Sequence, residues 1–146
     1  MRGESRPKPR RYIYRQRRYH PSEQLVWLMD LNIVPLVRVL NAFDGIDTVS
    51  SCGGHENPGP AQYEAGSWYV KFRVEWNEAG RSALEFLSWS INNEALKAGR
   101  DVILYPYAQP PDYARPGEGL SFVLEGHNEE DPIAFAAWLE RMAGLI

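Results

Sequence analysis

Cysteine is nearly missing from this sequence, in which Cys52 is the only one among 146 residues. A single cysteine excludes an intrachain disulfide and is typical of a reducing compartment. The sequence also lacks an apolar run of about 20 residues, the length that spans a bilayer. Its basic start is not followed by the apolar segment of a secretory signal. We therefore expect a soluble, cytoplasmic protein with no membrane partner.

The signatures of common catalysts are missing as well. There is no phosphate loop with its Lys-Ser/Thr pair, no dinucleotide-binding glycine pattern, no kinase signature and no Ser-His-Asp order. The three histidines fall in predicted loops or outside predicted elements, which is compatible with no catalysis at all. The sequence leaves the catalytic residues unknown, and it leaves open whether the protein is an enzyme.

Acidic residues are scarce at the start of the chain. Residues 1–18 contain eight Arg and Lys against one Glu, a net charge of +7, whereas the remaining residues carry −10. We interpret residues 1–20 as a basic N-terminal arm, whose arginines and tyrosines are able to contact RNA by charge and by stacking. The alternative is that the arm packs on its own acidic domain or on a second subunit of a homodimer.

Residues 21–146 have the length of one globular domain, and the chain has an ordinary content of 44% apolar and 24% charged residues. Alternation of apolar and polar residues predicts strands, and apolar residues at helical spacing after a cap or a proline predict helices. The predicted strands are 46–51, 67–75, 101–107 and 120–125, and the predicted helices start at Ser22, Pro35, Asn77 and Asp131, with fraying or a break at Asn92-Asn93. This order indicates a single α+β domain, in which two ββα units form a four-stranded, mainly antiparallel sheet with helices on one face.

The strand at 67–75 has two chemically different faces. Its large apolar residues alternate with Tyr69, Lys71 and Arg73, so one face is buried and the other is either solvated or meets an acidic ligand. Three further tyrosines lie around a proline-rich loop, and these are Tyr105, Tyr107 and Tyr113. They either wall a pocket or anchor that loop by packing.

The most informative stretch is DTVSSCGGHENPGP, residues 47–60. It joins two predicted strands, and its paired glycines allow a turn with positive φ whose backbone N–H groups are able to converge on an anion. We expect a ligand site here, formed by Ser50, Ser51, Cys52, Gly53, Gly54 and His55. The expected ligand is a small anionic or nucleotide-like molecule or RNA, and the alternative is a non-catalytic interaction protein.

Cys52 and His55 are open to three interpretations. They are half of a zinc site, a thiolate–imidazolium pair, or a buried thiol beside a surface imidazole. A zinc site would need His127 and a carboxylate such as Glu56 to reach the same loop. Because a single Cys-x-x-His is far less specific than paired Cys-x-x-Cys motifs, the sequence gives no metal assignment.

The run LNAFDGIDTVSSCGGHENP resembles the Thr-Ser-Ser-Cys loop of the wybutosine-synthesis methyltransferases that modify tRNA. The likeness covers about twenty residues, and Gly53-Gly54-His55 stands where that family usually has Ser-Gly-Arg. The resemblance implies a compact α+β domain whose ligand site is bordered by Ser50, Ser51 and Cys52. It also implies an S-adenosylmethionine-dependent, tRNA-modifying activity as an alternative function.

Overall fold

The computed structural model describes residues 29–108 and 120–144. The basic arm, the predicted helix start at Ser22 and the loop with Tyr113 lie outside the described residues. The elements are the 3-10 helix η3 (Leu31–Ile33), α1 (Val34–Ala42), β1 (Ile46–Cys52), β2 (Trp68–Val74), α2 (Glu78–Trp89), the π-helix η4 (Ser90–Ala95), β3 (Val102–Ala108), β4 (Leu120–Gly126) and α3 (Pro132–Met142).

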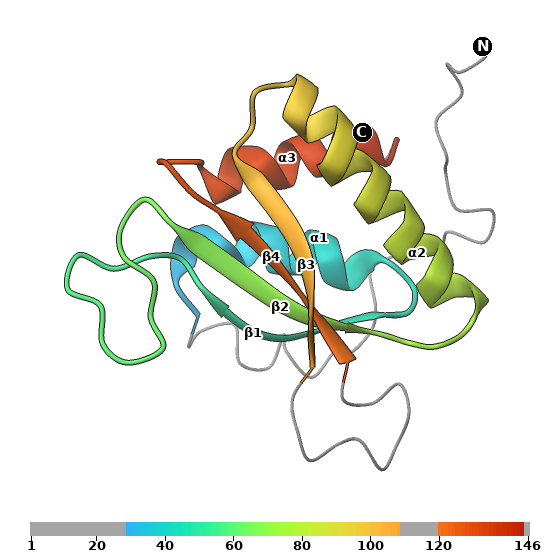
Figure 1. Cartoon of the computed structure of the whole chain (residues 1–146), viewed down its shortest axis with the longest axis horizontal. Coiled ribbons are helices and arrows are strands. Elements are labelled where there is room, and N and C mark those ends of the chain that lie inside the picture. Colours follow the sequence, from blue (N-terminus) through green and yellow to red (C-terminus); the bar gives the residue numbers. More distant parts are fainter. Residues whose placement is uncertain (1–28, 109–119, 145–146) are drawn as a thin grey trace.

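The four strands form one sheet in the order β1-β2-β4-β3, and every neighbouring pair is antiparallel. This confirms the predicted α+β fold. Figure 1 shows the strongly twisted sheet with α1 and α3 behind it, while α2 runs back along its flank toward the start of β3. The order places β1 and β3 at the edges, where Pro106 of β3 is tolerated because an edge strand leaves some N–H groups unpaired.

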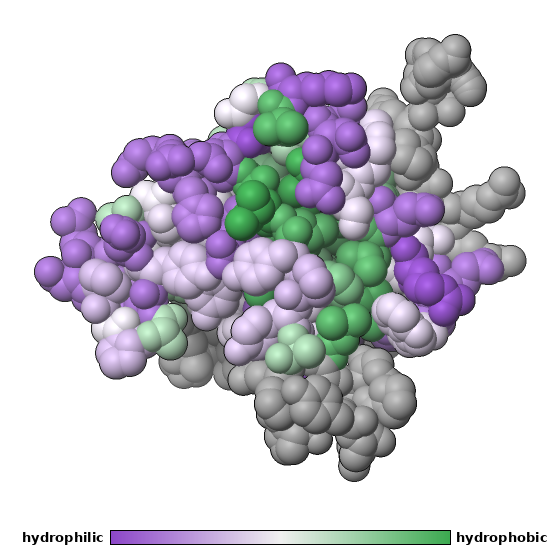
Figure 2. Space-filling view, viewed as in Figure 1, coloured by the Kyte–Doolittle hydropathy of each residue, from purple (hydrophilic) through white to green (hydrophobic). Residues whose placement is uncertain are grey.

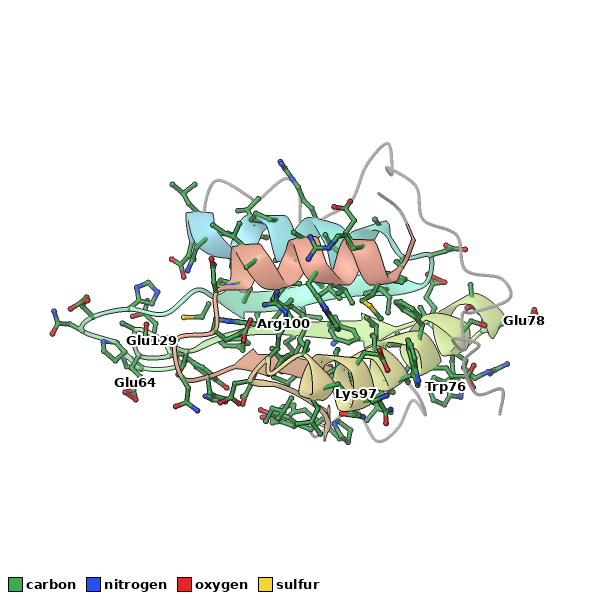
Figure 3. All side chains as sticks on the ribbon, turned by 90° about the horizontal axis from the view of Figure 1, so that it is seen from above. Glu64, Trp76, Glu78, Lys97, Arg100 and Glu129 are labelled. Carbon is green, nitrogen blue, oxygen red and sulfur yellow. The ribbon has the colours of Figure 1, made fainter. Side chains whose placement is uncertain are left out.

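One hydrophobic core joins the three helices to a single face of the sheet. Its largest fully buried side chains include Trp68 and Phe72 of β2, Phe86 of α2 and Phe135 of α3. Figure 3 looks along the sheet and shows α1 and α3 side by side on one side of the strands. No helix of the described residues lies on the opposite face of the sheet, which we call the open face.

The helices begin where the sequence predicts. Pro35 lies in the first turn of α1, the Asn77 side chain accepts from Gly80 N at 2.9 Å, and the Asp131 side chain accepts from Ile133 N at 2.9 Å. The predicted fraying or break at Asn92-Asn93 is wrong, because the helical path continues there as a π-helix. Burial of Ile91 and Ala95 in the core holds this segment in place.

A bulge in β1 sets which of its side chains face away from the helices. The register shifts between Thr48 and Ser50, after which Ser50 pairs with Lys71 and Cys52 with Tyr69. Directly paired residues of antiparallel strands share a face. Ser50 and Cys52 therefore lie on the same side as the polar residues of β2. Within the described residues, helices reach neither the length nor the apolar character that crossing a membrane requires.

Candidate functional site

The open face of the sheet, which the helices of the described residues leave uncovered, is rich in tyrosine. Pairing of Lys71 with Val123, and of Val123 with Tyr105, aligns the open-face residues of three strands. Figure 2 looks onto this face and shows weakly hydrophilic side chains gathered over the strands beside hydrophobic ones. The predicted two-faced character of β2 is thus extended across the sheet.

A hollow of about 200 Å³ opens on this face. Its lining comes from β2, β3 and β4, from the second half of β1 and from the loop that follows β1. The residues are Ser50, Ala61, Tyr63, Tyr69, Lys71, Tyr105, Tyr107 and Val123. The volume is below the roughly 300–1,000 Å³ of drug-sized ligand pockets, so the hollow fits one ring system with a small substituent.

Glu125 lies beneath two of these tyrosines and is their shared acceptor. Its side chain is only 9% exposed, and its Oε2 accepts from Tyr105 Oη at 2.6 Å and from Tyr63 Oη. Its other oxygen, Oε1, lies 3.0 Å from His127 Nε2. A buried carboxylate needs such donors, because an unpaired charge away from water is strongly disfavoured.

These contacts fix the protonation of the network. Burial works to raise the pKa of Glu125, but hydrogen bonds from Tyr105, Tyr63 and His127 outweigh it and the pKa is lowered. Burial, and then the neighbouring Glu125 carboxylate, raise the pKa of Tyr63 and Tyr105. At neutral pH the carboxylate is therefore ionised and both phenols are protonated, so each phenol hydrogen is directed at Glu125 and not at the hollow.

His127 extends this network to the start of β2. Its Nδ1 lies 3.4 Å from Ser67 Oγ, so Ser67, His127 and Glu125 form a chain. A serine nucleophile needs its base at about 2.6–3.2 Å. The Ser67–His127 contact is longer than this, and Glu125 is also bound by two tyrosines, so the chain links the start of β2 to the loop after β4.

Ring contacts organise the upper part of the hollow. Tyr63 and Tyr69 have ring centroids 4.7 Å apart, and the ammonium of Lys71 lies 4.3 Å from the centroid of the Tyr107 ring. Tyr107 is 41% exposed. Among the described residues, the hollow therefore has aromatic walls in ring contact and the ammonium of Lys71 on its lining.

The six predicted site residues divide between different surroundings. Ser50 lines the hollow, whereas Ser51 pairs with Val70 and is half-buried. Cys52 is buried, with 4% exposure, and accepts from Tyr63 N at 3.4 Å. His55 turns to Asp30, with 3.1 Å between its Nε2 and Asp30 Oδ2.

The paired glycines shape the loop. Gly54 has φ +96°, the positive value expected for the turn. Gly53 donates its N–H to Asp30 Oδ2 at 2.7 Å, and its carbonyl accepts from Asn32 Nδ2 at 3.0 Å. The backbone N–H of Gly53, one of those that the sequence predicted would bind an anion, is thus bound by the carboxylate of Asp30.

The loops that contain His55 and His127 lie at one end of the sheet, as Glu64 and Glu129 show in Figure 3. Glu129 N donates to Gly66 O at 3.0 Å, which joins the two loops. The histidines nevertheless contact different carboxylates, Asp30 and Glu125.

Comparisons of the chain with models of protein families, with curated proteins and with solved structures each give no match.

Sequence reasoning missed three residues of this region, namely Asp30, Tyr63 and Glu125. Each makes a contact with a distant part of the chain: 25 residues separate Asp30 from His55, and 62 separate Tyr63 from Glu125. The sequence contained one signal for Glu125. A carboxylate in an apolar strand, two residues before a histidine, is unusual because carboxylates are rarely buried without a partner.

Proposed function

We propose that the protein is a binding domain for a small planar ligand with one anionic group, a nucleotide-like molecule, held on the open face of the sheet beside the loop that follows β1. The observation that carries the proposal is the hollow lined by four tyrosines and Lys71. A ligand of this kind matches both its shape and its charge.

The aromatic walls of the hollow support the proposal that the ligand is planar. Tyr63 and Tyr69 are already in ring contact, and Tyr107 is exposed at the rim. Stacking of one base on an aromatic side chain is worth about 1–3 kcal/mol. Because the phenol hydrogens of Tyr63 and Tyr105 are taken by Glu125, these rings offer faces and edges to the ligand instead of hydrogen-bond donors.

Lys71 supports the proposal that the ligand carries an anionic group. Among the described residues, it is the charged one in the lining of the hollow, and the Tyr107 ring holds its ammonium over the open face. An ammonium contributes about 1.5–3 kcal/mol through a charge-assisted hydrogen bond to phosphate or carboxylate. One such cation suits a single anionic group better than a long phosphate backbone.

The test is calorimetric titration of the full chain with nucleoside monophosphates and with the matching neutral nucleosides. The parent is expected to prefer a monophosphate. Lys71→Met removes that preference, a loss of about tenfold or more in affinity, and Tyr107→Ala weakens the nucleoside and the monophosphate alike.

Arg73→Met is the matched control. Arg73 lies two residues from Lys71 on the same face and is exposed, but it does not line the hollow. Equal monophosphate affinity of Lys71→Met and Arg73→Met would overturn the proposal, and so would a parent that binds none of these compounds.

An S-adenosylmethionine-dependent, tRNA-modifying enzyme is the alternative that the Ser-Ser-Cys resemblance offers. The small volume of the hollow favours a mononucleotide over this longer cofactor. Titration with S-adenosylmethionine in the same series separates the two functions, because an enzyme of that class must bind the cofactor.

A further inference from the structure

Three different metal-binding side chains meet where β1 ends. One carboxylate oxygen of Asp30, the sulfur of Cys52 and one imidazole nitrogen of His55 all lie within 4.8 Å of one another. They come from the residue before η3, from the last position of β1 and from the turn that follows. We propose that these residues bind a transition-metal ion, and that Zn²⁺ is the ion that fits them.

The spacing suits a tetrahedral ion. Zinc lies about 2.3 Å from sulfur and about 2.0–2.2 Å from nitrogen or oxygen, which places two ligand atoms of one ion roughly 3.2–3.7 Å apart. His55 Nε2 and Asp30 Oδ2 are 3.1 Å apart, so this pair needs almost no movement. The bound of 4.8 Å on the sulfur contacts leaves at most about 1–1.5 Å to close.

The donor set is that of zinc. A thiolate, an imidazole and a carboxylate together form a borderline-soft set of ligands, whereas Mg²⁺ and Ca²⁺ take oxygen ligands. The described residues supply three ligands, so a four-coordinate ion keeps one position for water or a bound molecule. Three protein ligands with an open position are the pattern of reactive zinc centres, in contrast to closed structural sites.

The surroundings hold the ligands in place as an outer shell does in metal sites. The carboxylate of Asp30 accepts from Gly53 N, and the sulfur of Cys52 accepts from Tyr63 N. Asp30 occupies the N-cap position of η3 but makes no side-chain cap hydrogen bond. Its carboxylate is turned instead to the loop and to His55.

The backbone brings His55 back to the end of β1. Its N–H donates to Tyr63 O at 2.9 Å and its carbonyl accepts from Ala65 N at 2.8 Å. Cys52 is buried, while the side chains of His55 and Asp30 are 31% and 33% exposed. An ion therefore has an anchored sulfur below it and a route from solvent on the imidazole side.

The experiment uses the full chain after treatment with a chelator. Titration with Co²⁺ should produce the thiolate-to-cobalt charge-transfer absorption, and competition with a zinc indicator should give one Zn²⁺ per chain. Bound Zn²⁺ should also raise the melting temperature, because it binds the folded state. Affinity should fall as the pH is lowered, since protons compete for the thiolate and the imidazole.

Asp30→Asn and His55→Gln keep a polar side chain of similar size at each position. They therefore change one metal ligand without leaving a cavity. Each should weaken Zn²⁺ binding by more than about tenfold, because even an outer-shell partner is worth roughly 10–100-fold. Cys52→Ser should abolish the charge-transfer absorption. His127→Gln, in the neighbouring loop beside Glu125, is the control and should bind Zn²⁺ like the parent.

Unchanged Zn²⁺ affinity in both Asp30→Asn and His55→Gln would overturn the proposal, because the ion would then be bound elsewhere. A folded parent that binds no Zn²⁺, or that binds Co²⁺ without the charge-transfer absorption, would overturn it equally. In those cases His55 and Asp30 form an ion pair that closes the loop. Circular dichroism of the metal-free variants verifies that each one folds.

Discussion

Trp68 and Gly126 lie directly opposite each other on β2 and β4, and the indole ring fills the space that a side chain at position 126 would need. A Cβ atom at 126 would lie 2.1 Å from Trp68 Cε2. The indole Nε1 also donates to Glu130 O at 2.8 Å, which connects the core to the loop after β4. The missing side chain of Gly126 thus lets the largest core residue reach that loop.

Gly126→Ala is therefore expected to destabilise the fold by overpacking. The indole is 1% exposed and is held by its hydrogen bond to Glu130 O, so displacing it costs about 1–3 kcal/mol. For a domain of this size each kcal/mol lowers the melting temperature by roughly 3–6 °C. Gly59→Ala is the control, because its added Cβ meets nothing closer than 3.5 Å, and an equal loss in both variants would contradict the steric explanation.

Glu125→Gln should lower stability in a pH-dependent way. The pKa of Glu125 is lowered in the folded state from an ordinary value of 4.5, so the folded state gains from the carboxylate above that pH. This gain is lost as the pH falls through the folded-state pKa. At pH 7 the variant should lose about 1.5–3 kcal/mol, the worth of hydrogen bonds to a charged group.

Denaturant unfolding of parent and Glu125→Gln at about pH 7 and about pH 3 checks the sign, since protonation removes the charge-dependent gain. The difference in the free energy of unfolding should shrink at the lower pH. Glu64→Gln, at an exposed position of the loop at the same end of the sheet, should leave stability within about 0.5 kcal/mol of the parent. A difference for Glu125→Gln that grows in acid would be the opposite of the expected result.

A second polar contact protects the edge of the sheet. β1 is an edge strand, so its outward N–H groups need partners outside the sheet. Asn41 of α1, 4% exposed, accepts from Thr48 N at 2.9 Å and donates to Thr48 Oγ1 at 3.0 Å. The helix thereby pairs with the strand just before its bulge.

Asn41→Leu should cost about 1–3 kcal/mol in the free energy of unfolding, because it leaves the N–H of Thr48 without this partner. Thr48→Val removes only the hydroxyl and preserves the N–H bond to Asn41, so it should cost less. Thermal and denaturant unfolding of the two variants measure the order. The reverse order would show that the hydroxyl contact, and not the backbone contact, is the important one.

The fold was predictable because its signals are local. Alternation in β2, the cap at Asn77 and the Asp131-Pro132 pair each act within a few residues. The π-helical stretch was not predictable in this way. Burial of Ile91 and Ala95 keeps the chain on the core through two asparagines that taken alone favour a helix end.

The candidate sites were only partly predictable, since they depend on contacts between distant segments. The paired glycines and the open face of β2 were visible as patterns. The convergence of Asp30 on His55 and of Tyr63 on Glu125 follows from strand register and from the path of the loop at 53–67. A one-residue bulge at Val49 decides that Ser50 and Cys52 face the tyrosines, and no periodicity in the sequence signals it.

The two adjacent glycines of the loop, Gly53 and Gly54, have different structural roles. A Cβ at Gly54 would lie 2.5 Å from Ser67 O and 3.0 Å from Glu64 O, both backbone atoms, and the residue has φ +96°. At Gly53 the clash is with a side chain, at 1.9 Å from Asn32 Oδ1. Both Gly54→Ala and Gly53→Ala should therefore destabilise the loop, but for different reasons.

Deleting the Asn32 side chain distinguishes them. Asn32→Ala should recover most of the stability lost in Gly53→Ala, since the clashing group is gone, although its hydrogen bond to Gly53 O is also lost. The same change should not rescue Gly54→Ala, whose strain of about 1–3 kcal/mol lies in the backbone. Unfolding free energies of the single and double variants form two double-mutant cycles. Coupling to Asn32 should appear only in the Gly53 cycle. Equal coupling in both cycles would show that both substitutions clash with the Asn32 side chain.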